Sequence, residues 1–182
     1  QGHNVRNAGL HGARRRYRGH GLSRFGEPMS HLIATFFYVG HMRPAPGTWG
    51  SLAALLVGFA LVHISGATGL SIGIIASCLL GWWATAAETK GKEDHDPSEI
   101  VIDEVAGQWI ATLPLAIWPQ TFEIAIWYWL LAFSGFRLFD ITKPGLVGWA
   151  DRQVGPMSVM LDDIIAGLMA ATVICLVMVI LP

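Results

Sequence analysis

Residues 52–87 read LAALLVGFALVHISGATGLSIGIIASCLLGWWATAA, two apolar runs separated by the short turn SGATG at residues 65–69. Each run is longer than a strand, which usually has about four to eight residues, so both runs predict helices. The turn between them contains no Lys or Arg. Two apolar helices joined by so short a turn are expected to lie antiparallel, as a helical hairpin.

Apolar runs of the same kind continue along the chain. A short one at residues 32–39 precedes the hairpin, and longer ones follow at Val105–Trp118, Phe122–Phe139 and Ile164–Leu181. Since 53% of the residues are hydrophobic and only 14% are charged, against a usual charged share of about 25%, the composition favours a membrane protein. Two runs approach the ~20 residues of a full span, and two are marginal at about 14.

The sequence therefore predicts an all-α, multi-helical integral membrane protein with about five apolar helices, arranged as two hairpins plus a C-terminal helix. The second hairpin is expected to turn in the short segment WPQTF at residues 118–122. A soluble helical bundle with a hydrophobic core remains an alternative, because two of the runs are short.

The cations after residue 28 follow one pattern. They lie in or beside the loops before the first long run, between the second and third, and after the fourth: Arg43, Lys90, Lys92, Arg137, Lys143 and Arg152. If the runs span a bilayer, these loops share one face, and the positive-inside rule makes that face cytoplasmic. We expect a multi-pass membrane protein with this face in the cytoplasm.

Residues 1–28 differ in composition from the rest of the chain. They carry six arginines and a single acid, Glu27, with almost no apolar periodicity. Such a segment is expected to be a disordered basic extension, with Met29 as the functional start and residues 29–182 as the membrane domain. The extension could bind anionic lipid or nucleic acid, although we expect no nucleic-acid partner for the protein.

Three pairs of polar residues interrupt the apolar runs. They are Asp103-Glu104 in EIVIDEVAGQWI, Asp140 with Lys143 in FRLFDITKPG, and Asp162-Asp163 in SVMLDDIIAGL. A carboxylate beside hydrocarbon is costly unless a cation compensates it. Since all three pairs fall on the predicted cytoplasmic face, they indicate a divalent metal site there.

Each pair also has a simpler interpretation. Asp162-Asp163 is expected at the entry to the last helix, where carboxylates favour the helix dipole. Arg137, Asp140 and Lys143 are spaced to share a helix face as a ladder of ion pairs. Before the third run, Ser98 is a candidate helix N-cap.

The chemistry of these residues favours phosphate esters. All-oxygen ligands suit Mg²⁺ better than Zn²⁺, and Mg²⁺ beside Lys and Arg is common equipment for phosphoryl transfer. The turn PGTWGS at residues 46–51 enters a helix, and its backbone N–H groups and hydroxyls could hold a phosphate.

Three stretches, in the order PGTWGSLAAL, VIDEVAGQWI and FRLFDITKPGLVGWADRQVGPMSVMLDDIIAGL, resemble the phosphatidylglycerophosphatase A family. The resemblance covers about residues 36–175. It implies a Mg²⁺-dependent phosphatase of the inner membrane that converts phosphatidylglycerophosphate to phosphatidylglycerol. The family often has an aromatic–proline pair after the KP of the last motif, where this chain has Gly145-Leu146, which we expect to pack at the membrane interface.

The resemblance implies three groups of site residues. The metal ligands would be Asp103, Glu104, Asp162 and Asp163. The catalytic residues would be Asp103, Glu104, Asp140, Lys143 and Asp151. The substrate phosphate would be bound by Thr48, Ser51, Arg137, Lys143 and Arg152.

Water is the expected nucleophile, with Asp140 as the rival that would form an aspartyl phosphate. The oligomeric state and the number of metal ions stay open.

Another class of function, a small ion- or proton-coupled membrane transporter, would also explain carboxylates near a bilayer. It predicts carboxylates near mid-helix, whereas these lie near loops. Two other lipid enzymes are disfavoured, because neither the DG…AR…G…D…D arrangement of CDP-alcohol phosphotransferases nor the pattern of phosphatidic-acid phosphatases is present.

Overall fold

The computed structural model describes residues 26–92, 97–118, 121–153 and 155–180. In these ranges every regular element is a helix: α1 (Gly26–Ala34), a 3₁₀ turn η1 (Val39–His41), α2 (Pro46–Glu88), α3 (Ile102–Ile117), α4 (Phe122–Thr142), α5 (Leu146–Asp151) and α6 (Pro156–Ile180). The all-α prediction is therefore confirmed. The predicted disorder of residues 1–28 falls almost wholly outside the described residues.

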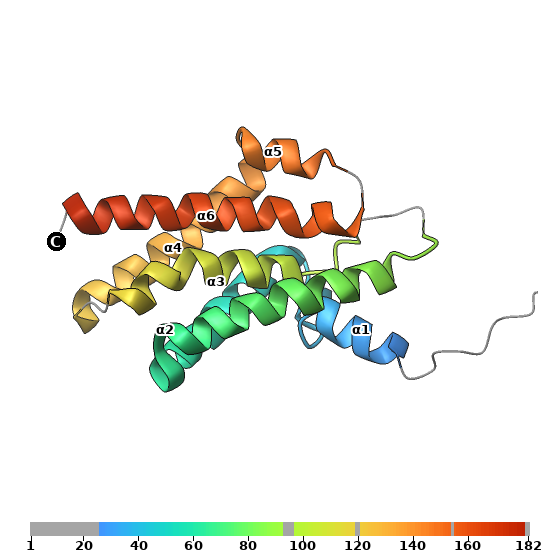
Figure 1. The fold of residues 1–182 in the computed structure, drawn as a ribbon, viewed down its shortest axis with the longest axis horizontal. Helices are drawn as coiled ribbons and strands as arrows, with labels where there is room; N and C mark the ends of the chain where they lie inside the picture. The colour runs from blue at the N-terminus through green and yellow to red at the C-terminus, as the bar shows by residue number, and fades with distance from the viewer. Residues whose placement is uncertain (1–25, 93–96, 119–120, 154, 181–182) are drawn as a thin grey trace, which may run out of the picture.

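The long helix α2 combines the first two predicted runs. Its backbone breaks at Gly66, where φ is 61° and ψ is −157°. A straight helix of 43 residues would be about 65 Å long, twice the roughly 30 Å of a bilayer core. The break gives two arms of bilayer length, which lie side by side (Figure 1). Contacts of Gly58 with Leu70 and of Gly73 with Leu61 join the two arms.

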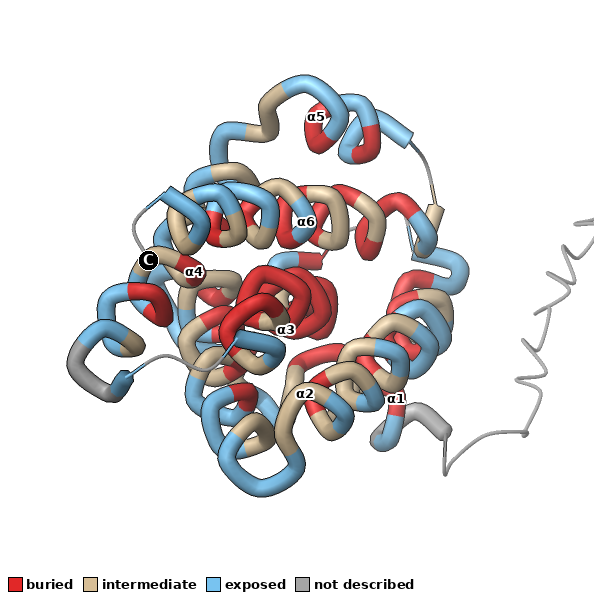
Figure 2. Tube along the Cα trace, turned by 60° about the vertical axis from the view of Figure 1, so that its left-hand side comes forward, coloured by how far each residue is buried: buried red, intermediate tan, exposed pale blue. Residues whose placement is uncertain are grey.

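Helix α3 is the centre of the bundle. Figure 2 shows it mostly buried, with α2, α4 and α6 around it. Trp109 of α3 packs against Gly58 and Gly73 of the two α2 arms, and its Nε1 donates a hydrogen bond to the carbonyl of Ala54 at 2.7 Å. A buried indole N–H needs such an acceptor, so this contact fixes α3 between the arms.

Three helices are long and apolar enough to cross a membrane: α2, the Ile124–Thr142 part of α4, and α6. Many of their large apolar side chains are exposed, such as Ile72, Leu138 and Leu168. In a water-soluble protein an apolar surface of that extent would be unfavourable, so the chain is a membrane protein.

Two sequence-based boundaries were wrong. Helix α6 begins at Pro156, eight residues before the predicted start, so Asp162 and Asp163 lie in its second turn and not at its entry. Ser98 is not an N-cap, because α3 has Val101 in that position and the Ser98 hydroxyl instead accepts a hydrogen bond from Arg43 at 3.3 Å.

Candidate active site

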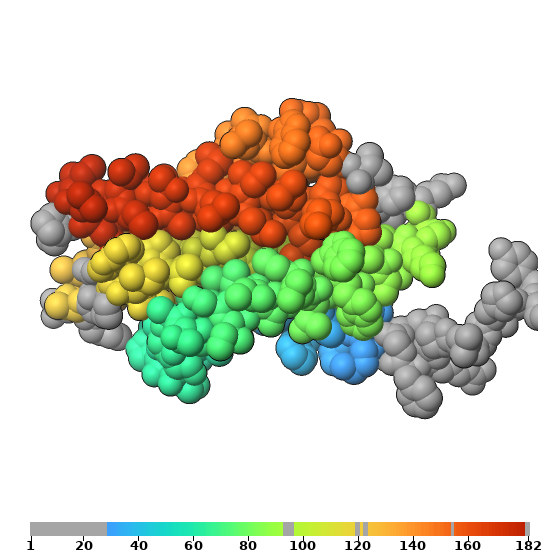
Figure 3. Space-filling view, in the orientation of Figure 1, coloured from blue at the N-terminus to red at the C-terminus, as the bar shows by residue number. Residues whose placement is uncertain are grey.

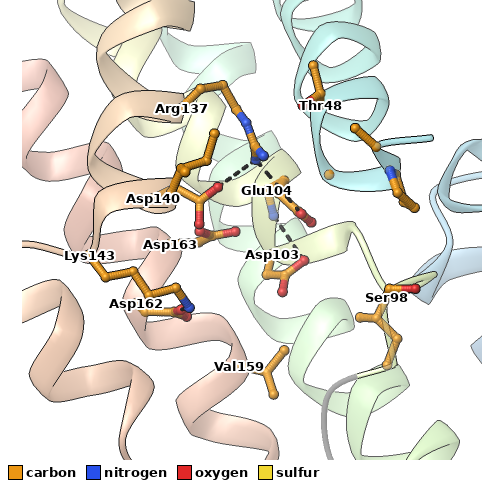
Figure 4. A pocket seen from close by; sticks show the side chains of 15 residues that line it. Thr48, Ser98, Asp103, Glu104, Arg137, Asp140, Lys143, Val159, Asp162 and Asp163 are labelled. Atoms are coloured by element: carbon orange, nitrogen blue, oxygen red, sulfur yellow. Dashed lines mark hydrogen bonds and ion pairs between the residues drawn. The ribbon is translucent and has the colours of Figure 1, made fainter. Parts of the chain in front are cut away.

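The predicted site residues gather at one end of the bundle, where α2 and α3 begin, α4 ends and α6 passes through its second turn (Figure 1). A cavity of about 350 Å³ lies between these segments (Figure 4). Its lining includes Thr48, Asp103, Glu104, Arg137, Asp140, Lys143, Asp162 and Asp163, together with Ala45, Pro46, Gly47, Ser98, Ile100, Ile141 and Val159.

Three carboxylates form the core of the cavity wall. Asp103, Glu104 and Asp163 each offer an oxygen, and these oxygens all lie within 4.8 Å of one another. The first two come from the first turn of α3 and the third from α6. They meet because glycines let the helix backbones touch: a Cβ on Gly167 would lie 2.4 Å from the carbonyl oxygen of Gly107.

These carboxylates fit a divalent cation. Side-chain oxygens of Glu104, Asp162 and Asp163 are buried without a hydrogen-bond partner among the described residues. A buried carboxylate oxygen without a compensating partner is costly. Ligands made only of oxygen suit a hard cation such as Mg²⁺. The ligand chemistry and the buried oxygens without a hydrogen-bond partner therefore both favour a bound divalent cation.

Arg137 lies beside this cluster and is held by three groups. Its Nη1 is 2.6 Å from Asp140 Oδ2 and 3.9 Å from Glu104 Oε1, and it donates a hydrogen bond to Ser51 Oγ at 3.3 Å. Ser51 is buried and donates to the carbonyl of Gly47 at 2.8 Å. The Arg137 side chain is therefore fixed between α2 and α4, at the edge of the cavity.

Lys143, in the left-handed conformation at the C-cap of α4, is the second cation. Its Nζ donates to Asp162 Oδ2 at 2.9 Å and also to Asp151 of α5. Although burial alone would lower the pKa of Lys143, the hydrogen bonds that Lys143 donates to Asp151 and Asp162 raise this pKa above its ordinary value. The group therefore keeps its charge at any physiological pH.

The start of α2 forms the part of the wall that contacts Arg137 through Ser51. Pro46 to Ser51 are the first residues of the helix, and the N-cap Ala45 offers no capping side chain. The N–H groups of a first turn lack intrahelical partners and attract anions. Gly47 leaves room for the Glu104 side chain, since a Cβ there would lie 2.2 Å from Glu104 Oε1 and would displace the carboxylate.

Three predicted site residues do not line the cavity. Ser51 reaches it only through Arg137, and Asp151 only through Lys143. Arg152 is exposed at the end of α5, and its guanidinium lies near Gly148. Prediction also missed several lining residues, among them Ile100, Ile141 and Val159, because an apolar side chain inside an apolar run carries no signal that sets it apart.

Comparisons with known proteins agree with this arrangement. The profile of one family, described as phosphatidylglycerophosphatase A, matches residues 32–178, which includes the region of the sequence resemblance. A phosphatidylglycerophosphatase A of Haemophilus influenzae is 36% identical over 79% of this chain and 85% of its own length. One of Escherichia coli is 34% identical over 79% and 80%.

A third relative bears a different name. A putative phosphatidylinositol-3-phosphatase of Bacteroides thetaiotaomicron is 38% identical over 75% of this chain and 85% of its own length. No solved structure matches the chain.

Proposed function

The chain belongs to the phosphatidylglycerophosphatase A family, and we propose that it hydrolyses phosphatidylglycerophosphate to phosphatidylglycerol and phosphate at the cavity between α2, α3, α4 and α6, with the help of Mg²⁺. The observation that carries this proposal is the meeting of Asp103, Glu104 and Asp163 within 4.8 Å, next to two fixed cations.

Asp103, Glu104 and Asp163 would hold the ion. Asp162, which was also predicted as a ligand, is not part of this group, and its Oδ2 accepts a hydrogen bond from Lys143. When bound, Mg²⁺ supplies charge neutralisation for the phosphate and makes water a better nucleophile. Because the ligand set is made of carboxylates alone, Mg²⁺ is favoured over Zn²⁺.

The chain's own cations bind and orient the substrate phosphate. Arg137 and Lys143 offer N–H donors to the phosphoryl oxygens, whose charge spreads in the transition state. Thr48 and the first turn of α2 add further donors in the cavity wall. Asp151 holds Lys143 in place, and the exposed Arg152 attracts the anionic headgroup from outside the cavity.

Water attacks the phosphorus and gives up a proton, the bond from phosphorus to the glycerol oxygen breaks, and that oxygen takes up the proton and leaves as the hydroxyl of phosphatidylglycerol. Asp140 orients Arg137 in this scheme, which the 2.6 Å contact between them supports. If Asp140 were instead the nucleophile, an aspartyl phosphate would form and then be hydrolysed, and these two displacements would retain the configuration at phosphorus, whereas direct attack by water would invert it.

We further propose that the two arms of α2 and the pair α3–α4 form two hairpins across the bacterial inner membrane, with α6 as a last crossing. The cavity then opens toward the cytoplasm. The transporter alternative is less well supported, because Asp103 and Glu104 are in the first turn of α3 and Asp162 and Asp163 are in the second turn of α6, away from mid-helix.

The test is phosphate release by the purified protein from phosphatidylglycerophosphate, and from a phosphatidylinositol phosphate, with Mg²⁺ or with excess chelator. We expect release from phosphatidylglycerophosphate only with the metal. Asp103→Asn and Asp163→Asn should each lower kcat at least about a hundredfold, since metal ligation contributes several kcal/mol to the transition state. Glu99→Gln, a neighbouring acid outside the cavity lining, is the matched control.

Full activity in chelator, or in the double variant of Asp103 and Asp163, would overturn the metal site. Faster release from the phosphatidylinositol phosphate would overturn the assigned substrate while leaving the reaction class intact.

A further inference from the structure

Ile141 combines two properties that rarely meet in one residue. It lines the charged cavity, yet 67% of its surface is exposed. A fully enclosed cavity would bury its apolar lining, so the cavity is open beside Ile141. It follows Asp140 directly and lies one helical turn beyond Arg137, both of which line the same cavity.

The opening continues into an apolar face of α4. Trp127, Leu130, Leu138 and Ile141 are all exposed, and their spacing of three, eight and three residues places them on one face of the helix. From Ile141 to Trp127 this face is about 21 Å long. One leaflet of a bilayer core is roughly 15 Å thick, so the face is long enough for the acyl part of one phospholipid.

The order of polar and apolar groups along α4 matches that of a phospholipid. Arg137, Asp140 and Lys143 are at the cavity end of the helix, and the exposed apolar face runs from there toward its N-terminus. A lipid whose phosphate reached the cavity would have its acyl chains directed along this face. The charged end of α4 therefore matches the phosphate of a phospholipid, and the exposed apolar face of α4 matches its acyl chains.

The short helix α5 places the cavity at the depth of the lipid headgroups. It stands out from the side of the bundle next to α6 (Figure 3), and it exposes Leu146 and Trp149. Trp side chains in exposed positions near helix ends are typical of the membrane interface. Lys143 at the end of α4 and Asp151 at the end of α5 form an ion pair. This ion pair fixes α5 beside the cavity.

We propose that the phospholipid substrate enters the cavity sideways from the bilayer past Ile141, with its acyl chains lying on the exposed face of α4 formed by Trp127, Leu130, Leu138 and Ile141. This inference rests on the proposed phosphatase function and adds to it the route and the binding surface of the lipid. Ile141 and Leu138 are then the residues that distinguish a membrane lipid from a water-soluble phosphate ester.

The test compares two substrates that differ only in their chains, dioleoyl- and dibutanoyl-phosphatidylglycerophosphate, in detergent micelles. Ile141→Asn is compared with Ile72→Asn, which changes an isoleucine of similar exposure, 63%, on α2 and outside the cavity lining. We expect Ile141→Asn to lower the ratio of kcat/KM for the long-chain to the short-chain substrate about five- to tenfold, because it removes apolar contact with the chains. Ile72→Asn should keep the wild-type ratio.

Leu138→Asn, which does not line the cavity, is a second variant and should lower the same ratio. The inference is overturned if the ratio is unchanged in the variants of Ile141 and Leu138, or if Ile72→Asn lowers it equally. Entry from the aqueous end of the bundle would give the first of these results. If wild-type protein releases phosphate from neither substrate, the proposed function itself fails and this inference falls with it.

Discussion

Ser51 has a different task from the one its hydroxyl suggests. It is buried, its own proton goes to the carbonyl of Gly47, and it accepts a hydrogen bond from Arg137. We therefore propose that Ser51 is a positioning residue, which holds a guanidinium that would otherwise have only Asp140 and Glu104 to direct it. A misplaced catalytic or binding group is costly because orientation contributes strongly to rate.

Ser51→Ala is expected to raise KM for phosphatidylglycerophosphate about three- to tenfold, since one hydrogen bond to a charged group contributes about 1.5 kcal/mol. It should leave the Mg²⁺ concentration for half-maximal activity unchanged, because the carboxylate cluster is intact. Steady-state kinetics with a Mg²⁺ titration measures both quantities.

Ser77→Ala is the matched control for Ser51→Ala. Ser77 is also buried in α2 and also donates to a backbone carbonyl, that of Ile74 at 2.9 Å, but it does not line the cavity. It should keep the wild-type KM. Equal kinetic effects in the two variants would show that Ser51 acts only through the stability of α2.

The sequence predicted a cluster of four carboxylates, of which Asp103, Glu104 and Asp163 lie together while Asp162 lies outside that group. Asp103, Glu104 and Asp163 stand out because acids in apolar runs are expensive. Ser51 was predicted to bind phosphate directly, as hydroxyls in a glycine-rich turn often do. In the structure it contacts Arg137, and this contact depends on the distance between α2 and α4. The spacing of residues along the sequence does not predict the distance between two helices.

At the scale of elements, the contact between α3 and α6 builds the site. A Cβ on Gly107 would lie 2.6 Å from the carbonyl oxygen of Asp163, and one on Gly167 would lie 2.4 Å from the carbonyl oxygen of Gly107. Real Cβ atoms do not approach backbone that closely, so any side chain there separates the helices. The separation would move Asp163 away from Asp103 and Glu104.

Gly167→Ala should therefore destabilise the protein by about 1–3 kcal/mol through overpacking, although alanine by itself favours a helix by about 1 kcal/mol over glycine. Activity should fall further than stability, with a higher Mg²⁺ requirement, because the metal ligands move apart. A thermal unfolding assay and a Mg²⁺ titration would measure these effects.

Gly135→Ala is the comparison for this variant, because its Cβ would meet only the Cβ of Ala170, at an ordinary 3.7 Å. It should be neutral or slightly stabilising. A Gly167→Ala protein that is as stable and as active as Gly135→Ala would contradict the close contact between α3 and α6.

Helices were predictable and their ends were less so. Long apolar runs of Leu, Ala and Ile predict helices because they are too long for strands, and this prediction is correct for α2, α3, α4 and α6. The start of α6 was misplaced because Asp162 and Asp163 read as a polar boundary. Pro156, which suits the first turn of a helix, was the better signal.

At the scale of the whole molecule, the cavity and the cations lie at the same end. Arg43, Lys143 and Arg152 are beside the loops of that end, whereas the turn between α3 and α4, which includes Thr121, is at the other. The rule that relates loop cations to the cytoplasmic side therefore predicts that the cavity faces the cytoplasm. A cytoplasmic cavity would meet a substrate made on that side of the membrane.

Single cysteines on the two ends test this orientation. In a background of Cys78→Ala and Cys175→Ala, Gln153→Cys would report on the cavity end and Thr121→Cys on the opposite end; both residues are exposed and uncharged. A membrane-impermeant maleimide should label Thr121→Cys in spheroplasts and Gln153→Cys in inside-out vesicles. The reagent reaches only the periplasmic face of the membrane in spheroplasts and only the cytoplasmic face in inside-out vesicles. Permeabilised cells should label both variants equally. Labelling of Gln153→Cys in intact spheroplasts would place the cavity outside the cytoplasm, and labelling of both variants from one side would mean that α3 and α4 do not form a spanning pair.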